Sequence, residues 1–258
     1  MSVTRTDGLT MTDILDVPHI ESVTYQNNFI TNAVCELRFP TLLGFDETAL
    51  INVRKKLKRD YPLFEMGQSI SVGGPDGLNK ETHYYFYSKD RKWWVKFRSS
   101  AVTLETEDYK DFEDFSKRLE AVISASKDSI DTDFFTRVGL RYINLVPIKD
   151  NELSGWIRPE LISSILTGAL GTLRAIKSEV QGFIADGFYS FRHGLRINEK
   201  ETGDKSSYFL DFDYFDENVE VGNAVDLVKK YNEVNFSFFQ WCLAEKAVKE
   251  LGPGKKKQ

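Results

Sequence analysis

The sequence predicts a soluble protein of the α+β class, built from two copies of one unit of strand, helix, strands and helix. Aromatic residues make up 13% of the 258 residues, and aromatic side chains favour strands and buried interfaces. Alternating and helical hydrophobic patterns follow one another in the same order twice along the chain. A chain of this length buries roughly 70–75% of its unfolded surface, which is enough for an extended core.

The first half begins with a strand and ends with a helix. Apolar Cys35 and Leu37 alternate with charged Glu36 and Arg38, the period of a strand with one buried face. Asp46 has the side chain and position of a helix cap before an apolar run with helical spacing. The predicted elements are strand 32–39, helix 47–60, strand 69–72, strands 83–88, 92–99 and 101–106, and helix 111–125.

The same order begins again after residue 130. Leu140 and Tyr142 alternate with Arg141, which predicts a strand. Pro159 suits the first turn of a helix, where its missing N–H costs nothing. The predicted elements are strand 137–146, helix 159–174, strands 179–184, 188–199 and 208–215, and helix 223–251.

Short sequence matches between the halves favour an internal duplication. Three matches in the same order as the elements carry more weight than any one alone. They pair 35–39 with 138–142, Phe97-Arg98 with Leu195-Arg196, and 104–107 with 210–213. The predicted organisation is a mobile arm and lead-in at 1–28, a first repeat at 29–130, a second repeat at 131–251 and a basic disordered tail at 252–258.

Two such units side by side would form one antiparallel sheet whose helices all pack on the same face. The other face would stay open, as in the saddle of a TATA-binding-protein-like fold. Because successive strand residues point to opposite faces, the residues that alternate with the apolar ones, most of them charged, are predicted on the open face. These residues are Glu36, Arg38, Trp94, Arg98, Arg141, Arg192, Arg196, Asp211 and Asp213.

This face has two interpretations. It is either a solvated surface of cross-strand ion pairs, each worth at most about 1 kcal/mol, or a docking surface. Arginine forks bind carboxylates and phosphates, and Trp94 offers a ring for stacking. The assignment depends on register, since a shift of one residue would exchange the two faces.

No catalytic or cofactor motif stands out, and we predict no cofactor and no metal. The three histidines are far apart, and the glycine-rich segment 73–77 lacks the lysine and serine or threonine of a phosphate-binding loop. Paired carboxylates at Asp211 and Asp213, with Glu217, leave a metal-dependent nuclease as an alternative. The formal net charge of −5 argues against a general nucleic-acid coat.

The expected compartment is the cytoplasm. Cys35 and Cys242 lie in apolar segments and are predicted to be buried free thiols, as a reducing compartment would keep them. No stretch has the ~18 apolar residues that cross a bilayer. The polar N-terminal segment lacks the apolar centre of a signal peptide. We therefore predict no membrane partner.

The motif Arg-Val-Gly-Leu-Arg-Tyr-Ile-Asn at 137–144 resembles the hallmark of a sporadically distributed bacterial family of uncharacterised proteins. Segments 32–39, 210–213 and 235–239 add to the resemblance, which covers about 29–251. The chain departs from the family at 230–232, where it has Lys-Tyr-Asn and family members commonly have a histidine. The resemblance implies proximity to mobile or defence genes, such as anti-phage or toxin–antitoxin loci, and brings no catalytic residue.

The main functional hypothesis is a non-enzymatic accessory or inhibitory protein that binds a protein partner through the open face or the aromatic C-terminal helix. The absence of catalytic motifs and the mixed-sign arginine face motivate it. One alternative is recognition of nucleic acid or a nucleotide on the same face, which rising salt would weaken steeply. The nuclease is the other alternative.

Overall fold

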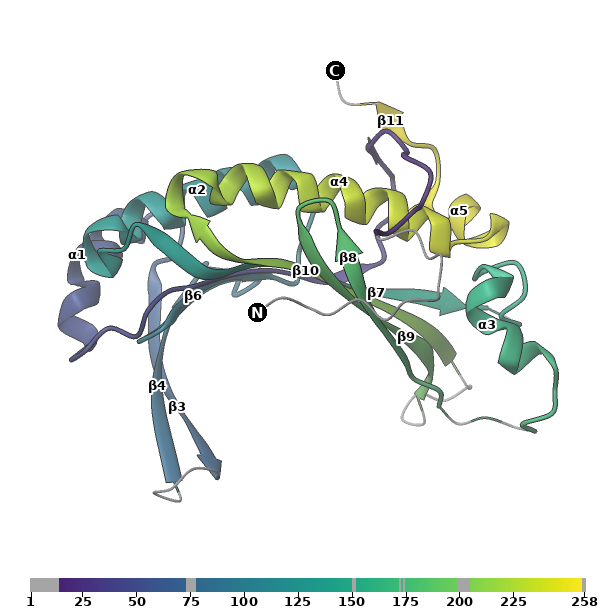
Figure 1. Ribbon diagram of the computed structural model, residues 1–258, viewed down its shortest axis with the longest axis horizontal. Coiled ribbons are helices and arrows are strands. Elements are labelled where there is room, and N and C mark those ends of the chain that lie inside the picture. The colour runs from purple at the N-terminus through teal and green to yellow at the C-terminus, as the bar shows by residue number, and fades with distance from the viewer. Residues whose placement is uncertain are drawn as a thin grey trace, which may run out of the picture.

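Nine strands form one antiparallel sheet in a computed structural model that describes residues 14–72, 78–149, 152–171, 173, 175–198 and 205–256. Their order across the sheet is β3-β4-β5-β6-β2-β7-β10-β9-β8. The sheet arches, so that its two outer parts turn down at the ends (Figure 1). The strands are β2 Ile30–Arg38, β3 Leu63–Val72, β4 Leu78–Tyr87, β5 Trp93–Arg98, β6 Ala101–Thr106, β7 Phe134–Ile148, β8 Ser178–Ile184, β9 Gly187–Asn198 and β10 Lys205–Glu220.

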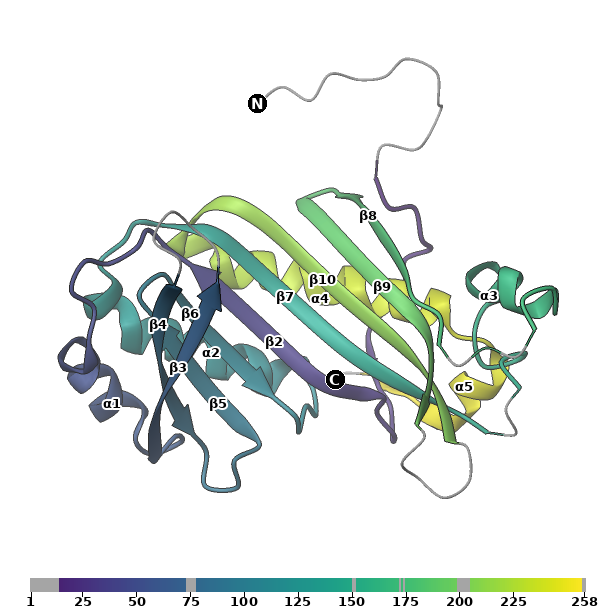
Figure 2. The ribbon, with the colours of Figure 1, turned by 90° about the horizontal axis from the view of Figure 1, so that it is seen from below.

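Two long helices lie side by side on the convex face of this sheet, and the strands are in full view from the other side (Figures 1 and 2). The structure thereby confirms the α+β class and a large antiparallel sheet. A short 3-10 turn, η1 Glu47–Leu50, leads into the first helix. The helices are α1 Ile51–Leu57, α2 Phe112–Ile130, α3 Pro159–Leu166, α4 Ala224–Cys242 and α5 Glu245–Leu251.

The predicted start signals act as expected. Asp46 accepts a hydrogen bond from the Thr48 amide, and Asp111 accepts one from the Asp114 amide at the start of α2. Each aspartate satisfies an amide that the first helical turn leaves without a partner. Apolar residues of α2, among them Phe115 and Leu119, are fully buried against the sheet. Capping and amphipathicity thus fix where α2 begins and which side it buries.

The predicted helix 223–251 is wrong in one respect, because it is two helices separated at Leu243 and Ala244. Leu243 is extended and bridges Ile157, and the Ala244 amide donates to the Trp156 carbonyl. Backbone pairing with a distant segment therefore replaces helical hydrogen bonds at this point. No local signal marks the break, since the sequence there has neither glycine nor proline.

Two other predicted lengths also change. Helix α3 ends at Leu166, not at residue 174, and glycines with positive φ follow at Gly168 and Gly171. That backbone conformation is common after helix ends. Strand β3 begins at Leu63, six residues before the predicted start, because it pairs along its whole length with β4. The glycine-rich segment 73–77 lies outside the described residues.

The strand order is the same on either side of the central pair β2 and β7. The last strand of each half, β6 or β10, lies next to the centre, followed by β5 or β9 and then by β4 or β8. Strand β3 has no counterpart in the second half. The two halves therefore correspond in element order and in position across the sheet.

The register agrees with only part of the residue matches made from sequence. Two matches agree with the strand pairing, those of 97–98 with 195–196 and of 104–107 with 210–213. Together they make Leu195 the counterpart of Phe97 and Tyr208 the counterpart of Val102. Phe97 indeed pairs with Val102, and Leu195 pairs with Tyr208. The third match does not fit these two. Cys35 lies opposite Leu104, whereas Leu210 lies opposite Asn144 and not opposite Val138.

The described parts of the lead-in and of the tail make backbone contacts. The Leu15 amide donates to the Phe183 carbonyl at the edge of the sheet. Val23 and Thr24 (β1) pair with Lys255 and Lys256 (β11). These contacts are made by main-chain groups, so the polar side chains of these segments do not reveal them. Residues 1–13 and 257–258 lie outside the described part of the chain.

Candidate binding face of the sheet

The concave side of the sheet is the face on which the predicted site residues lie. On β2, Cys35 and Leu37 are buried beneath the helices, while Glu36 and Arg38 are on the opposite side and accessible. Strands β5, β7, β9 and β10 alternate in the same way. We call this side the open face. From the predicted set it carries Glu36, Arg38, Trp94, Arg98, Arg141, Arg192, Asp211 and Asp213.

Glu36 forms ion pairs with three arginines of the open face and accepts hydrogen bonds from two of them, Arg38 and Arg98. Its carboxylate oxygens lie 2.6 Å from Arg38 Nε and 3.0 Å from Arg98 Nη2. Arg137 Nη1 approaches the same carboxylate to 3.8 Å. Arg98 also lies 3.8 Å from Glu81. Two of the predicted arginines are therefore held by one carboxylate, and neither is a free cation.

Asp211 plays the same role on the second half. Arg141 donates to both of its oxygens, from Nε and Nη2, at 2.7 Å each. Arg192 Nη1 lies 3.7 Å from Asp211, and its Nε lies 3.1 Å from Glu179. The two-point hydrogen bonding of Arg141 is the strongest geometry for this pair. It also raises the pKa of the Arg141 guanidinium.

Arg137 connects the two clusters, although sequence reasoning did not select it. Its Nη2 donates to both oxygens of Asp213 at 3.0 and 3.1 Å, and its guanidinium lies 4.5 Å from the centre of the Phe215 ring. Burial raises the pKa of Asp213, and the charge of Arg137 opposes that shift. Arg137 shares its parity on β7 with Arg141, so alternation alone assigns it to the open face.

The arginines of this face are therefore neutralised within the molecule. Arg38, Arg98 and Arg137 contact Glu36, and Arg141 and Arg192 contact Asp211. A phosphate would have to displace carboxylates that already occupy the donor positions. The cross-strand ion pairs of the first interpretation are therefore present on this face. The Arg196 side chain lies outside the described residues.

Aromatic side chains of β4 and β5 lie beside the ion pairs of the open face. His83, Tyr85 and Tyr87 form a stacked row along β4, with ring centres 6.3 and 5.7 Å apart. Trp94 of β5 continues the row, 6.2 Å from Tyr87. Each of these rings is partly exposed. Of these rings, only Trp94 was predicted from the sequence, although the alternation of β4 places Tyr85 and Tyr87 on the same face.

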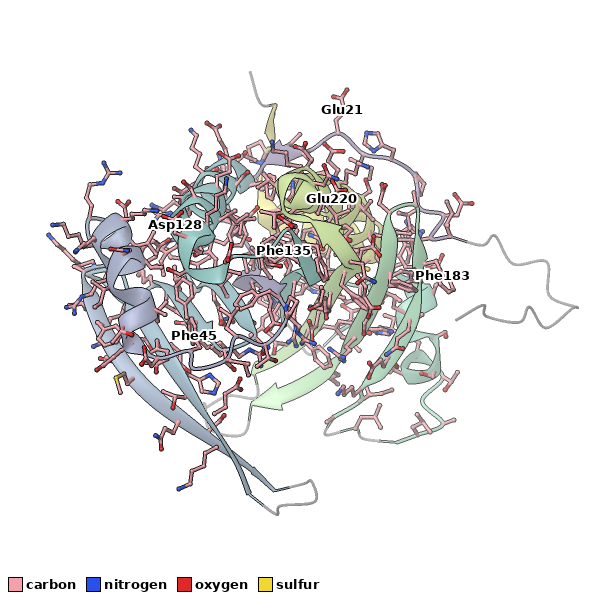
Figure 3. All side chains as sticks on the ribbon, turned by 60° about the vertical axis from the view of Figure 1, so that its left-hand side comes forward. Glu21, Phe45, Asp128, Phe135, Phe183 and Glu220 are labelled. Atoms are coloured by element: carbon pink, nitrogen blue, oxygen red, sulfur yellow. The ribbon has the colours of Figure 1, made fainter. Side chains whose placement is uncertain are left out.

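A second aromatic cluster lies at the other end of the open face. Phe188 is 5.3 Å from Phe183 and 5.5 Å from Phe215, measured between ring centres. Phe183 is 51% exposed and lies at the outer edge of the molecule (Figure 3). Exposed aromatic rings that gather at one place are characteristic of binding surfaces. We call this group the β8 cluster and the other the β4 cluster.

The described residues hold no group of histidine, cysteine and acidic side chains arranged for a metal ion. Asp211 and Asp213, the carboxylates of the nuclease alternative, are engaged by arginines. Ser69 Oγ lies 2.7 Å from His83 Nε2, but His83 Nδ1 has no partner within the described part of the chain. A catalytic Ser–His pair needs a third group on that nitrogen to orient the ring.

Comparison with known proteins assigns no family. No protein-family model matches the chain, and no curated protein matches it significantly. The resemblance based on the motif at 137–144 therefore stays a prediction. Among the described residues, no helix combines the length and apolar character needed to cross a bilayer. Cys35 and Cys242 are buried free thiols, and burial raises the pKa of both.

Proposed function

We propose that this chain is a non-enzymatic binding protein that holds a protein partner on its open face. One observation carries the proposal: a concave sheet face without covering helices has partly exposed aromatic clusters at both ends and a neutralised charged strip between them. The partner that fits is a protein segment with apolar side chains spaced to reach both clusters and polar groups between them.

The composition of the face supports a protein partner. Tyrosine, tryptophan, phenylalanine and arginine are the residues enriched at protein interfaces. Arg141 uses Nε and Nη2 for Asp211, and its Nη1 has no partner among the described residues, so it can donate to a partner carbonyl. The side chain of Arg141 is 40% exposed. An arginine held in place by a carboxylate loses little conformational freedom on binding.

The same ion pairs weigh against nucleic acid. Phosphate binding depends on unpaired cations and releases counterions from the nucleic acid. Here each open-face arginine whose side chain is described has a carboxylate within 4 Å. The family resemblance supplies the biological context of the proposal: an accessory or inhibitory partner of another bacterial protein, in a defence-linked or toxin–antitoxin setting.

The experiment compares a two-cluster variant with an exposure-matched control. The test variant combines Trp94→Ser and Phe183→Ser. The control is Leu166→Ser on α3, because Leu166 is 50% exposed, almost the same as Phe183. Each tagged protein is incubated with nuclease-treated extract of the source cell, and the retained proteins are quantified by mass spectrometry. We expect a stoichiometric protein that the test variant retains at least ~10-fold less and the control retains fully.

Two outcomes contradict the proposal. One is a partner that wild type, test variant and control retain equally. The other is found when the capture is repeated without nuclease: the protein retains nucleic acid and no protein partner, and the amount retained falls steeply as the salt concentration rises. Arg38→Glu gives an independent check, because the Arg38 side chain is 48% exposed and its substitution leaves Arg141 and Asp211 intact. It should weaken the same partner.

We also infer that the two halves arose by duplication into a TATA-binding-protein-like saddle. The shared element order and the mirrored strand order support it, as does the common register of β5–β6 and β9–β10. The match of 35–39 with 138–142 is six residues out of register with the other two matches. A common origin therefore requires that β2 or β7 has moved by six residues along its neighbouring strand. A superposition of 29–130 on 131–251 that fails to align β2 with β7 would contradict the inference.

A further inference from the structure

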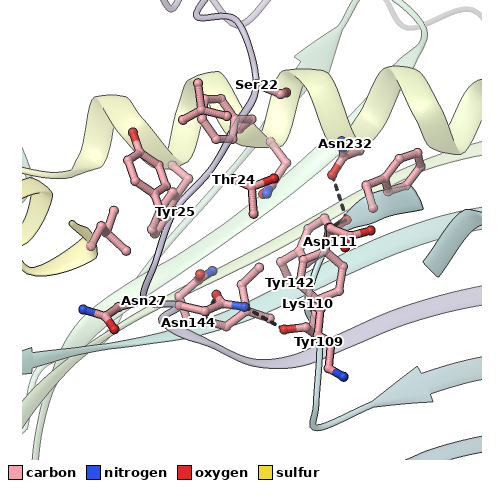
Figure 4. Close-up of a pocket in the computed structure, with 18 residues that line it drawn as sticks. Ser22, Thr24, Tyr25, Asn27, Tyr109, Lys110, Asp111, Tyr142, Asn144 and Asn232 are labelled. Atoms are coloured by element: carbon pink, nitrogen blue, oxygen red, sulfur yellow. Dashed lines mark hydrogen bonds between the residues drawn. The ribbon is translucent and has the colours of Figure 1, made fainter. Parts of the chain in front are cut away.

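The cavities on the helix-covered side of the sheet differ in size. One of about 100 Å³ lies beneath the lead-in and beside α4 (Figure 4). Its polar wall is satisfied internally, because the Tyr142 hydroxyl donates to Asn232 Oδ1 at 2.9 Å and lies 3.3 Å from the Tyr109 hydroxyl. A cavity of about 150 Å³ holds one benzene molecule, so this one admits no ring. Another cavity, of about 530 Å³, has the size of a small-molecule site.

The larger cavity lies where α2 ends and α4 begins. Phe135 and Glu220, on the paired strands β7 and β10, mark its position in Figure 3. Phe135 and Ile130 are at most 4% exposed and close its bottom. Ile123 of α2 and Val221, at the start of the short 3-10 turn before α4, also line it, and both are only partly buried. We call this cavity the α2 pocket; it has accessible apolar walls above a packed base.

One wall of the α2 pocket carries a cation. Lys127 lines the pocket four residues after Ile123 and three before Ile130, so it lies on the same side of α2 as both. Its side chain is exposed and forms no ion pair within the part of the chain that the structure describes. The methylene stem of a lysine packs on apolar surface while its ammonium stays in water. The Lys127 ammonium is therefore available at the mouth of the pocket.

The wall formed by the sheet carries a carboxylate. Asp133 lines the pocket two residues before the buried Phe135, and its carbonyl accepts from the Val221 amide at 3.1 Å, which continues the pairing of β7 with β10. Residues two apart on a strand point to the same side, so the Asp133 side chain lies on the side of the pocket. It is exposed, and none of the described cations pairs with it. Glu220 adds negative charge at the mouth, although its carboxylate already accepts from Asn223 Nδ2.

These groups restrict the charge of a ligand. Lys127 and Asp133 line one pocket and do not pair with each other, so each can contact a ligand group of opposite charge. A ligand that is only an anion would be repelled by Asp133 and Glu220. A ligand that is only a cation would be repelled by Lys127 and leave it unpaired. Hydrogen bonds between charged groups are the strong ones, so a ligand that carries both charges fits best.

We propose that the α2 pocket binds a free amino acid with an apolar side chain. The α-carboxylate accepts from Lys127 Nζ, the α-ammonium donates to the Asp133 carboxylate, and the apolar side chain lies against Ile123 and Val221. A residue inside a peptide has neither charge and a chain terminus has only one, which favours a free amino acid over a protein segment. The pocket lies on the other side of the sheet from the open face, so its test does not depend on the proposed protein partner.

Matched probes test each part of the ligand. L-phenylalanine carries both charges, 2-phenylethylamine lacks the carboxylate, 3-phenylpropionate lacks the ammonium, and glycine lacks the side chain. L-leucine is measured in parallel with 3-methylbutylamine and 4-methylpentanoate. Binding to the full chain is followed by isothermal titration and ligand-observed NMR.

We expect at least one of the two amino acids to bind saturably. Its two singly charged analogues should bind at least ~5-fold more weakly, because each loses one ion pair. Glycine should bind at least ~10-fold more weakly, because it buries no apolar side chain. The proposal is overturned if neither amino acid binds at millimolar concentration, or if an amine or a carboxylate binds as tightly as the amino acid.

Variants test the residue assignment. Lys127→Met keeps an apolar stem and removes the charge, and Asp133→Asn keeps the shape and removes the charge. Each should weaken binding of the amino acid at least ~5-fold. Lys127→Met should not weaken binding of the amine, which has no carboxylate for Lys127 to contact. Asp133→Asn should likewise not weaken binding of the singly charged carboxylate.

The control is Asp131→Asn, the same chemical change two residues before Asp133. Asp131 is exposed and does not line the pocket, so this variant should bind as wild type does. All three substituted side chains are exposed, so the variants should keep the fold. Unchanged affinity in both Lys127→Met and Asp133→Asn overturns the assignment. An equal loss in the control also overturns it, because the effect would then come from the overall charge of this end of the molecule.

Discussion

The two faces of the sheet are built from different interactions. The covered face consists of large apolar and aromatic side chains: Phe212 is 4.8 Å from Phe191 and 5.2 Å from Phe238, measured between ring centres. The open face consists of arginines and carboxylates that lie on neighbouring strands, such as Arg141 and Asp211. The same nine strands therefore carry a dry side and a charged side, and stability and recognition fall to opposite faces.

This difference has an energetic meaning. Burial of apolar area is the dominant favourable term in folding. An intact ion pair adds little net stability, but removing one of its partners costs stability because the other charge is left unpaired. Substitutions on the covered face should therefore cost stability in proportion to the volume removed. Substitutions on the open face should depend on whether they leave a charge without its partner.

The largest expected effect is on the covered face. Phe212→Ala removes a ring that is 1% exposed, and we expect a loss of about 3–5 kcal/mol in the free energy of unfolding, measured by urea denaturation. The control is Phe183→Ala, whose ring is about half exposed, with an expected change within about 0.5 kcal/mol. Similar losses in the two variants would remove the distinction between the faces.

The next effect concerns the open face. Asp211→Ala leaves Arg141 and Arg192 without a shared carboxylate. The carboxylate is 9% exposed but Arg141 is 40% exposed, so we expect a loss of about 2 kcal/mol, less than for a fully buried pair. In the double variant Asp211→Leu with Arg141→Met, most of that loss should return. If the double variant is the less stable one, the pair contributes more than its desolvation costs.

A smaller effect depends on pH and concerns the covered face. Burial lowers the pKa of His193, whose Nδ1 lies 2.6 Å from Tyr208 Oη. A histidine with a lowered folded pKa binds its proton more readily when unfolded, so stability falls as the pH drops below about 6.5. One such proton gives a slope of at most about 1.4 kcal/mol per pH unit.

His193→Asn should reduce that slope, measured by urea denaturation between pH 7 and 5. Burial also lowers the pKa of His83 on the open face, so a His83→Asn variant separates the two contributions.

Asp213 acts at lower pH and in the opposite direction. Its raised pKa in the folded state stabilises the fold at pH values below the pKa of the unfolded chain, and this contribution is lost as the pH rises through the folded-state pKa. A slope that neither histidine variant changes contradicts the assignment.

The smallest effect belongs to neither face. Glu113 and Lys117 form an i,i+4 pair on the solvent side of α2, and both side chains are 69% exposed. Glu113→Gln should leave the urea midpoint unchanged at physiological salt, since such pairs are screened by water and ions. A clear loss of stability would mean that exposed charges contribute as much as those on the open face.

Sequence predicted the faces well because alternation is a local property. Glu36 and Leu37 fall on opposite sides whatever the rest of the chain does. The ion pairs could not be predicted, because Arg137 reaches Glu36 only through the pairing of β2 with β7, about a hundred residues apart in sequence. The break at Leu243 likewise results from a contact with Ile157. Long-range partners leave no trace in local patterns.

The buried position of Asn235 could have been predicted from the sequence. On α4, Asn235 has the same helical spacing as the buried Tyr231 and Phe238, so periodicity places a polar amide on the apolar side of the helix. A buried amide of this kind needs a hydrogen-bond partner. What the sequence could not predict is that the lead-in packs on α4, where the Ile20 amide donates to Ser237 Oγ.

The carboxylate of Glu36 also specifies how the central strands align. A displacement of β2 along β7 by two residues would keep every apolar side chain beneath the helices, so hydrophobic patterning opposes it only weakly. Such a displacement would move Glu36 by about 7 Å and separate it from Arg137. The ion pairs of the open face thus select one register of β2 on β7 among those that the apolar face would accept equally. They thereby fix the position of one half of the chain relative to the other.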